Sequence, residues 1–199
     1  MEIAKPTEQK AISIKPLTDH IGAEVFGADL TASMGKTNFD LIRRSLSDWG
    51  VLVFRGQNWT PEEHIAFSRC FGPLEDHVLS DYCLPGHPEI FVVSNIIENG
   101  KHIGAFGGSK RYHSDLSYMH EPSLGSIFHC LECPEDEGET SFTSMFAVYD
   151  ALPVERKKWL EARLGVHDYV WNFENNHTSI WFVSDPENIL EVRTWFSLE

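Results

Sequence analysis

Short apolar runs separated by glycine and proline turns recur along the chain, and they limit its fold more than any other feature. Residues 11–17 alternate apolar and polar side chains, which predicts a half-buried strand, whereas residues 51–54 are apolar throughout and predict a strand buried on both faces. Further strands are expected at residues 22–27, 90–93, 126–132, 140–144 and 166–171. These runs outnumber the helical patterns, so the sequence predicts mainly β structure.

Apolar residues at helical spacing occur in two parts of the chain. Residues 39–49 and 61–71 form the first pair of expected helices, and residues 145–152 and 153–164 form the second. Thr60, Pro61 and Glu63 provide a capping box with proline at the first helical position. Strands with helices at two places favour an α+β fold, in which an antiparallel sheet core is flanked by helices.

Glycines indicate where several of these elements end. Gly50 is expected to stop the first helix, Gly72 the second and Gly165 the last. Asn99-Gly100 is a dipeptide typical of a two-residue hairpin turn. The glycine-rich residues 104–110 are expected to form a mobile loop without a phosphate-binding pattern.

The charge and composition restrict the range of partners. The chain has 199 residues, 42% of them apolar, which is enough for one domain with a core. A net charge of −14 disfavours nucleic acid and anionic membranes as partners. The first ten residues do not resemble a signal peptide, and no run reaches the roughly 18 apolar residues of a membrane span. The expected location is cytoplasmic.

His113 and Asp115 form the motif with the clearest chemical meaning. If their segment is extended, residues two apart share a face, and an imidazole and a carboxylate point into one cavity. Such a pair supplies two of the three ligands in the two-histidine, one-carboxylate site of non-heme Fe(II). The alternative is a polar pair on a strand with no metal, because this spacing also arises by chance.

Cys130 and Cys133 have the spacing of a zinc or redox motif. No second cysteine pair lies nearby, and Cys130 falls in an alternating apolar run. A buried, reduced thiol is therefore the expectation for Cys130, with a functional pair as the alternative.

Several motifs in a fixed order resemble the TauD/TfdA family of Fe(II)- and 2-oxoglutarate-dependent dioxygenases. The resemblance covers roughly residues 11–173 and depends on order and spacing rather than on any single motif. The matching stretches are residues 22–25, 27–30, 51–57, 71–74, 93–95, 112–118, 138–140, 151–153 and 166–168.

The resemblance implies a fold, an activity and a set of site residues. The fold would be a double-stranded β-helix, a jelly roll of the clavaminate synthase-like type. The enzyme would hydroxylate a small anionic organic substrate and release succinate and CO2, with Fe(II) as cofactor and 2-oxoglutarate as co-substrate. His113 and Asp115 would bind iron, and Thr140 would contact 2-oxoglutarate. His77, Leu116 and Phe173 would line the substrate pocket.

The family pattern also has a distal histidine and an arginine that pairs with 2-oxoglutarate, and neither is matched here. We therefore expect residues 1–173 to be the N-terminal part of a dioxygenase domain, and residues 174–199 to be an unmatched tail. The jelly roll would be incomplete, and its uncovered sheet edges would favour a homo-oligomer. The weak substitutes for the missing groups are His120, His129, His167, His177 and Arg193.

Three functions remain open at this point. The first is a dioxygenase whose sequence is truncated or altered near residue 173. The second is a non-catalytic or degenerate member that acts as a binding domain or is completed by a partner. A third, weaker reading is a metal-dependent hydrolase using His113 and Asp115, although no nucleophile motif accompanies them.

Overall fold

The computed structural model describes residues 11–31, 34–77, 79–106, 112–135 and 138–167, together with the backbone of Ile180–Val183 and Trp195–Phe196. The chain divides into two compact units, Met1–Gly108 and Ser109–Glu199. Within the described residues, no helix combines the length and apolar character needed to cross a membrane. Each unit is described separately.

A three-stranded sheet begins the first unit. Strand β1 (Ser13–Pro16) pairs antiparallel with β2 (Ala23–Phe26), and β2 pairs parallel with β3 (Leu52–Val53). A parallel pair needs a long crossover, which helix α1 (Lys36–Trp49) provides. The prediction that residues 51–54 are buried on both faces is wrong, because β3 lies at the sheet edge and all four residues are half-buried.

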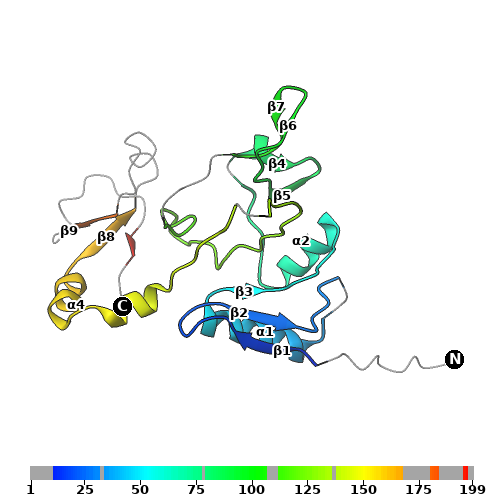
Figure 1. The fold of residues 1–199 in the computed structure, drawn as a ribbon. Helices are drawn as coiled ribbons and strands as arrows, with labels where there is room; N and C mark the ends of the chain where they lie inside the picture. The colour runs from blue at the N-terminus through cyan, green and yellow to red at the C-terminus, as the bar shows by residue number, and fades with distance from the viewer. Residues whose placement is uncertain are drawn as a thin grey trace. The chain divides into compact units, whose positions relative to one another are not determined.

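Helix α1 packs against this sheet through its apolar side and forms the core of the unit (Figure 1). Ile42, only 1% exposed, contacts Ile12 of the chain entering β1 and Val25 of β2. Gly50 ends the helix as predicted, with φ of 66° and its N–H donating to the carbonyl of Leu46. The positive φ explains why glycine suits this position.

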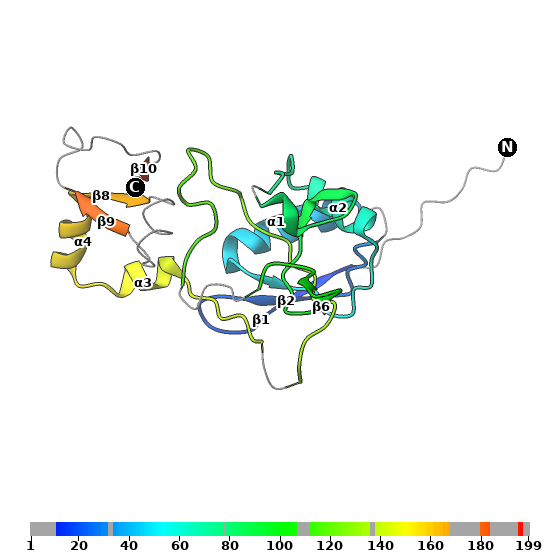
Figure 2. The ribbon, with the colours of Figure 1, turned by 90° about the horizontal axis from the view of Figure 1, so that it is seen from above.

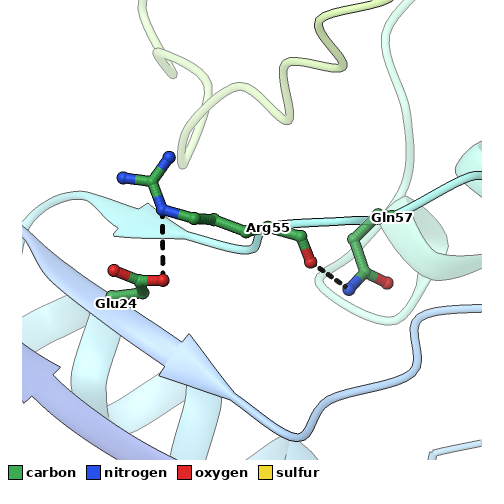
Figure 3. Close-up of polar contacts among 3 residues, drawn as sticks. All are labelled: Glu24, Arg55 and Gln57. Carbon is green, nitrogen blue, oxygen red and sulfur yellow. Dashed lines mark hydrogen bonds and ion pairs between the residues drawn. The ribbon is translucent and has the colours of Figure 1, made fainter.

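Polar contacts join three of the sequence stretches used for the family resemblance, and Figure 3 shows those of Arg55. Arg55 Nε lies 3.1 Å from Glu24 Oε1 of β2, and Gln57 Nε2 donates to the carbonyl of Arg55 at 3.2 Å. Gln57 also accepts from the N–H of Leu30 at 3.1 Å. Because Arg55 is largely exposed, its ion pair to residues 22–25 adds little stability, whereas Gln57 joins residues 51–57 to residues 27–30 by two hydrogen bonds.

Helix α2 (Pro61–Arg69) begins with the predicted capping box. The N–H of Glu63 donates to Thr60 Oγ1, and Glu63 Oε2 accepts from the N–H of Thr60. The helix ends at Arg69 rather than continuing to residue 71. Arg69 then pairs with Glu89 of strand β5 at 2.9 Å.

The rest of the first unit consists of two small hairpins. The 3-10 helix η1 (Ser80–Tyr82) precedes β4 (Cys83–Leu84), which pairs with β5 (His87–Phe91). The strand predicted at residues 90–93 therefore lies earlier in the chain, at His87–Phe91. Val93 lies outside it and forms a single β-bridge with Ala105. Strands β6 (Ile97–Glu98) and β7 (Lys101–His102) are joined by the predicted turn, with positive φ at both central residues.

The second unit contains two short helices and a three-stranded sheet (Figure 2). Helices α3 (Met145–Ala151) and α4 (Val154–Glu161) precede β8 (Leu164–His167), which lies between β9 (Ile180–Val183) and β10 (Trp195–Phe196). Gly165 was predicted to stop the last helix, but it lies within β8, and Ala162 caps α4. Both expected helices are otherwise present.

Two predicted strands are wrong. Residues 126–132 and the described residues around 140–144 have irregular backbone, since alternation alone does not provide a pairing partner. Among the residues of this unit whose burial is described, only Gly165 and Val166 are buried. Many large apolar side chains are exposed, including Leu124, Phe128, Leu131, Phe142, Met145 and Phe146.

Candidate metal site

His113 and Asp115 come together in the second unit, as the sequence motif predicts, although not on a strand. His113 Nε2 lies 3.0 Å from Asp115 Oδ1. Residues 115–118 form a turn, and Leu116 has a positive φ of 54°. The chain therefore turns directly after the pair, and the segment is not part of a strand.

The spacing of the two donor atoms suits a shared metal ion. Divalent first-row ions hold nitrogen and oxygen donors at about 2.0 to 2.2 Å, so two donors at right angles lie about 3 Å apart. The same distance serves as a hydrogen bond when no ion is bound. Both side chains are accessible, with 47% of the His113 side chain and 67% of the Asp115 side chain exposed. An ion from solvent can therefore reach them.

The pair is not joined by a third ligand in the part of the chain that the structure describes. No group of three or more histidine, cysteine, aspartate or glutamate side chains there could hold a metal ion. His120, His129 and His167 are described and do not complete such a group, whereas His177 and Arg193 lie outside the described residues. The described site thus consists of one imidazole and one carboxylate.

A hydrogen bond connects the turn to strand β8, and the sequence motif gave no indication of it. His167 Nδ1 lies 2.9 Å from Ser117 Oγ. The strand residue preceding His167, Val166, is almost fully buried, so β8 is the best-packed described element of this unit. His167 therefore links the turn that carries Asp115 to strand β8.

Burial lowers the pKa of His167 below its ordinary value of 6.5. The unfolded chain consequently takes up a proton near pH 6.5, while the folded chain takes one up only at lower pH. We expect the free energy of unfolding to fall as pH decreases through 6.5. It should fall less in His167→Asn, because the asparagine amide can still hydrogen-bond to Ser117 but does not titrate in this pH range. Urea unfolding midpoints at about pH 5.5 and 7.5 measure this difference. Equal pH dependence in both proteins would contradict the assignment.

The other predicted site residues are not all gathered around the pair. Leu116 follows Asp115 in the turn and is half-buried. Thr140 is exposed on irregular backbone, and no described contact links it to His113 or Asp115. Phe173 lies outside the described residues. His77 belongs to the first unit, where its Nδ1 accepts from the N–H of Leu79 and its ring stacks on Phe91.

A hollow in the first unit contains none of the predicted site residues. It has a volume of about 470 Å³ and is lined by Asp81, Tyr82, Lys101 and His102. His102 Nδ1 is buried without a hydrogen-bond partner. The sequence offered no signal for this hollow, because its residues come from η1 and β7.

The cysteine prediction needs correction. Cys130 was expected to be buried, but both Cys130 and Cys133 are exposed free thiols. The reason is that residues 126–132 form no strand, so their alternation does not direct Cys130 into a core.

A family model for the taurine catabolism dioxygenase TauD, TfdA family matches residues 13–192. This chain belongs to the TauD/TfdA family. The match includes the turn with His113 and Asp115, and it extends past residue 173, where the motif-by-motif resemblance stops. The family is one of enzymes, dioxygenases that use Fe(II) and 2-oxoglutarate.

Curated proteins are similar in sequence to this chain over part of their length. The chain is 37% identical over 146 residues to the pentalenolactone F synthase of Streptomyces arenae, covering 71% of this chain and 48% of that protein. It is 32% identical over 168 residues to the alpha-ketoglutarate-dependent 2,4-dichlorophenoxyacetate dioxygenase of Cupriavidus pinatubonensis, covering 79% of this chain and 58% of that protein. The chain spans about half the length of the curated relatives it matches.

The fold of this TauD/TfdA chain also resembles solved structures. A taurine dioxygenase from Burkholderia xenovorans aligns with a TM-score of 0.64 and 27% identity, covering 80% of this chain and 54% of the other. The chain therefore shares its fold with part of that solved structure.

Proposed function

We propose that this chain carries part of the active site of an Fe(II)- and 2-oxoglutarate-dependent dioxygenase, with His113 and Asp115 as two of the iron ligands. The approach of His113 Nε2 to Asp115 Oδ1 at 3.0 Å carries the proposal, because it brings the two donor types that suit Fe(II) within reach of one ion. Family membership supports the same assignment. The third ligand would come from residues outside the described group.

Each remaining site residue has a role that its chemistry allows. The exposed hydroxyl of Thr140 would donate to 2-oxoglutarate. Since His77 Nδ1 accepts a backbone N–H, the neutral ring carries its proton on Nε2, which can donate to an anionic substrate group. Leu116 and Phe173 would supply apolar contacts in the substrate pocket and exclude water.

The substrate would be a small anionic organic molecule. Bound iron would supply the activation of dioxygen, coupling conversion of 2-oxoglutarate to succinate and CO2 with insertion of one oxygen atom into a substrate C–H bond. The names of two relatives, a 2,4-dichlorophenoxyacetate dioxygenase and a taurine dioxygenase, fit this class, since a phenoxyacetate and taurine both carry an anionic group.

The complete fold would be a double-stranded β-helix of which this chain supplies a part. The exposed apolar side chains of the second unit, such as Phe128 and Phe146, support this reading, because a finished jelly roll buries its inner faces. The division into a dioxygenase part at residues 1–173 and a tail at 174–199 stays a prediction. A cytoplasmic location and a homo-oligomer also stay predictions.

Succinate release tests this function. The protein is incubated in air with Fe(II), 2-oxoglutarate and either 2,4-dichlorophenoxyacetate or taurine, and succinate is measured by chromatography. We expect succinate that requires iron and falls to background in the double variant His113→Ala, Asp115→Ala. Succinate at background level in the unsubstituted protein with both substrates would contradict turnover by this chain.

A second candidate is a non-catalytic domain that is completed by a partner. The exposed apolar surface of the second unit favours it. Metal binding that depends on His113 without any succinate would support this candidate. Succinate formation by the purified protein alone would exclude it.

A further inference from the structure

Phe91, the last residue of strand β5, lies against the imidazole of His77, and the sequence motifs gave it no role. We infer that Phe91 is a positioning residue, which holds the His77 ring so that its Nε2–H meets a carboxylate or sulfonate oxygen of the substrate in one fixed direction. The inference rests on the proposed function for the role of His77, and it adds the residue that orients this side chain. All the contacts that carry it lie within the first unit.

Two contacts hold the imidazole from different sides. The ring of His77 stacks on that of Phe91, with the ring centroids 3.9 Å apart and the planes at 26°. Nδ1 of His77 accepts the N–H of Leu79 at 3.1 Å. The stacking fixes the plane of the imidazole, and the hydrogen bond fixes the edge that faces Leu79, because a half-turn of the ring would put a carbon in place of Nδ1. Together the two contacts favour one ring orientation.

Phe91 is itself held by a paired strand. It lies opposite Cys83 of β4, and the N–H of the next residue, Val92, donates to the carbonyl of Tyr82 at 2.9 Å. The rings of Tyr82 and Phe91 pack edge-to-face, with their centroids 6.3 Å apart. A side chain on a strand is placed more precisely than one on a loop, and His77 lies outside any helix or strand. The hairpin therefore supplies the rigidity that the His77 segment lacks.

The second ring nitrogen of His77 remains available for a ligand. Within the described residues, no hydrogen bond or ion pair to Nε2 of His77 occurs, and the residue is only half-buried. Since Nδ1 is an acceptor, the neutral ring carries its proton on Nε2. A single N–H donor suits an oxygen of a carboxylate or sulfonate, and it cannot accept a hydrogen bond from an ammonium group.

The alternative is that Phe91 only stabilises the β4–β5 hairpin. Phe91 is half-buried, and the core cluster around Ile42 does not include it. Leucine at this position keeps much of the apolar volume but loses the flat face, so Phe91→Leu separates the two roles. Phe54→Leu is the matched control, because Phe54 is another half-buried phenylalanine of the first unit, packed edge-to-face with Phe67.

Carbon-13 relaxation of the His77 ring in the whole chain tests the positioning without substrate or iron. The ring signal is assigned by its loss in His77→Gln. We expect the Cδ2–H bond of His77 to have an order parameter close to that of rigid backbone, about 0.85, and to fall below about 0.6 in Phe91→Leu. Phe54→Leu should leave the value unchanged, and Phe91→Tyr, which restores a flat ring, should keep it high.

Kinetics test whether the orientation serves substrate binding. With whichever of 2,4-dichlorophenoxyacetate or taurine yields succinate, Phe91→Leu should raise KM about two- to tenfold, the usual effect of one aromatic pair. The value of kcat should stay unchanged, because binding rather than chemistry is altered. In a His77→Gln background the same substitution should leave KM unchanged, since Phe91 acts through His77.

Either of two results would overturn the inference. One is a mobile His77 ring in the unsubstituted protein, or an order parameter that is the same in Phe91→Leu. The other is a rise in KM of equal size with and without His77. Circular dichroism checks that each variant is folded, and Phe91→Met replaces Phe91→Leu if the latter does not fold. Absence of succinate from every protein would contradict the proposed function instead, and the relaxation measurement would still decide whether Phe91 positions His77.

Discussion

Replacement of His113 by alanine is expected to weaken binding of a divalent metal by at least about tenfold. Loss of a residue that only orients a ligand typically costs 10- to 100-fold in affinity, and loss of the ligand itself should cost no less. The described site has only two protein donors, so removing the imidazole leaves Asp115 as its single contact. The fraction of free Mn(II), followed by electron paramagnetic resonance during titration, measures this affinity.

His120→Ala is the matched control for that experiment. His120 is an exposed histidine in the same unit and belongs to no group of three metal-binding side chains among the described residues. We expect its replacement to leave Mn(II) affinity unchanged. If both alanine variants bind Mn(II) as tightly as the unsubstituted protein, His113 is not a ligand.

Replacement of Ile42 by alanine is expected to lower the free energy of unfolding of the first unit by about 2 to 5 kcal/mol. Ile42 is 1% exposed and contacts Ile12 and Val25, so truncation leaves a cavity between α1 and the sheet. This loss is a large part of the stability of a typical domain. Urea denaturation followed by circular dichroism measures it.

Ile97→Ala provides the matched control, since it removes the same atoms from a residue of the same unit that is 60% exposed. Surface substitutions of this kind usually change stability by no more than about 0.5 kcal/mol. Equal losses for Ile42→Ala and Ile97→Ala would show that the core of the first unit is not where the structure has it.

The parts of the fold that depend on neighbouring residues could be predicted from the sequence. The capping box at Thr60, the glycine stop at Gly50 and the Asn99-Gly100 turn each depend on interactions within a few residues. Alternation was a weaker guide, because a strand needs a partner that lies far away in the chain. Residues 126–132 alternate but remain irregular, whereas β9, at residues where no strand was predicted, pairs with β8.

The candidate site was predictable in its residues but not in its local structure. The spacing of His113 and Asp115 correctly indicated that the two side chains approach each other. The segment is not a strand, however, because the chain turns from Asp115 onward and Leu116 adopts a positive φ that its side chain does not predict. The contact from Ser117 to His167 spans fifty residues, and no local pattern reveals such a contact.

The central claim is that His113 and Asp115 bind the iron of a 2-oxoglutarate-dependent site. The most direct measurement is the visible absorption spectrum of the protein titrated anaerobically with Fe(II) and 2-oxoglutarate. An oxoacid chelating a protein-bound Fe(II) gives a weak charge-transfer band. We expect this band in the unsubstituted protein and in His120→Ala, and we expect it to be absent from His113→Ala. Absence of the band from the unsubstituted protein at saturating iron and 2-oxoglutarate would contradict the claim.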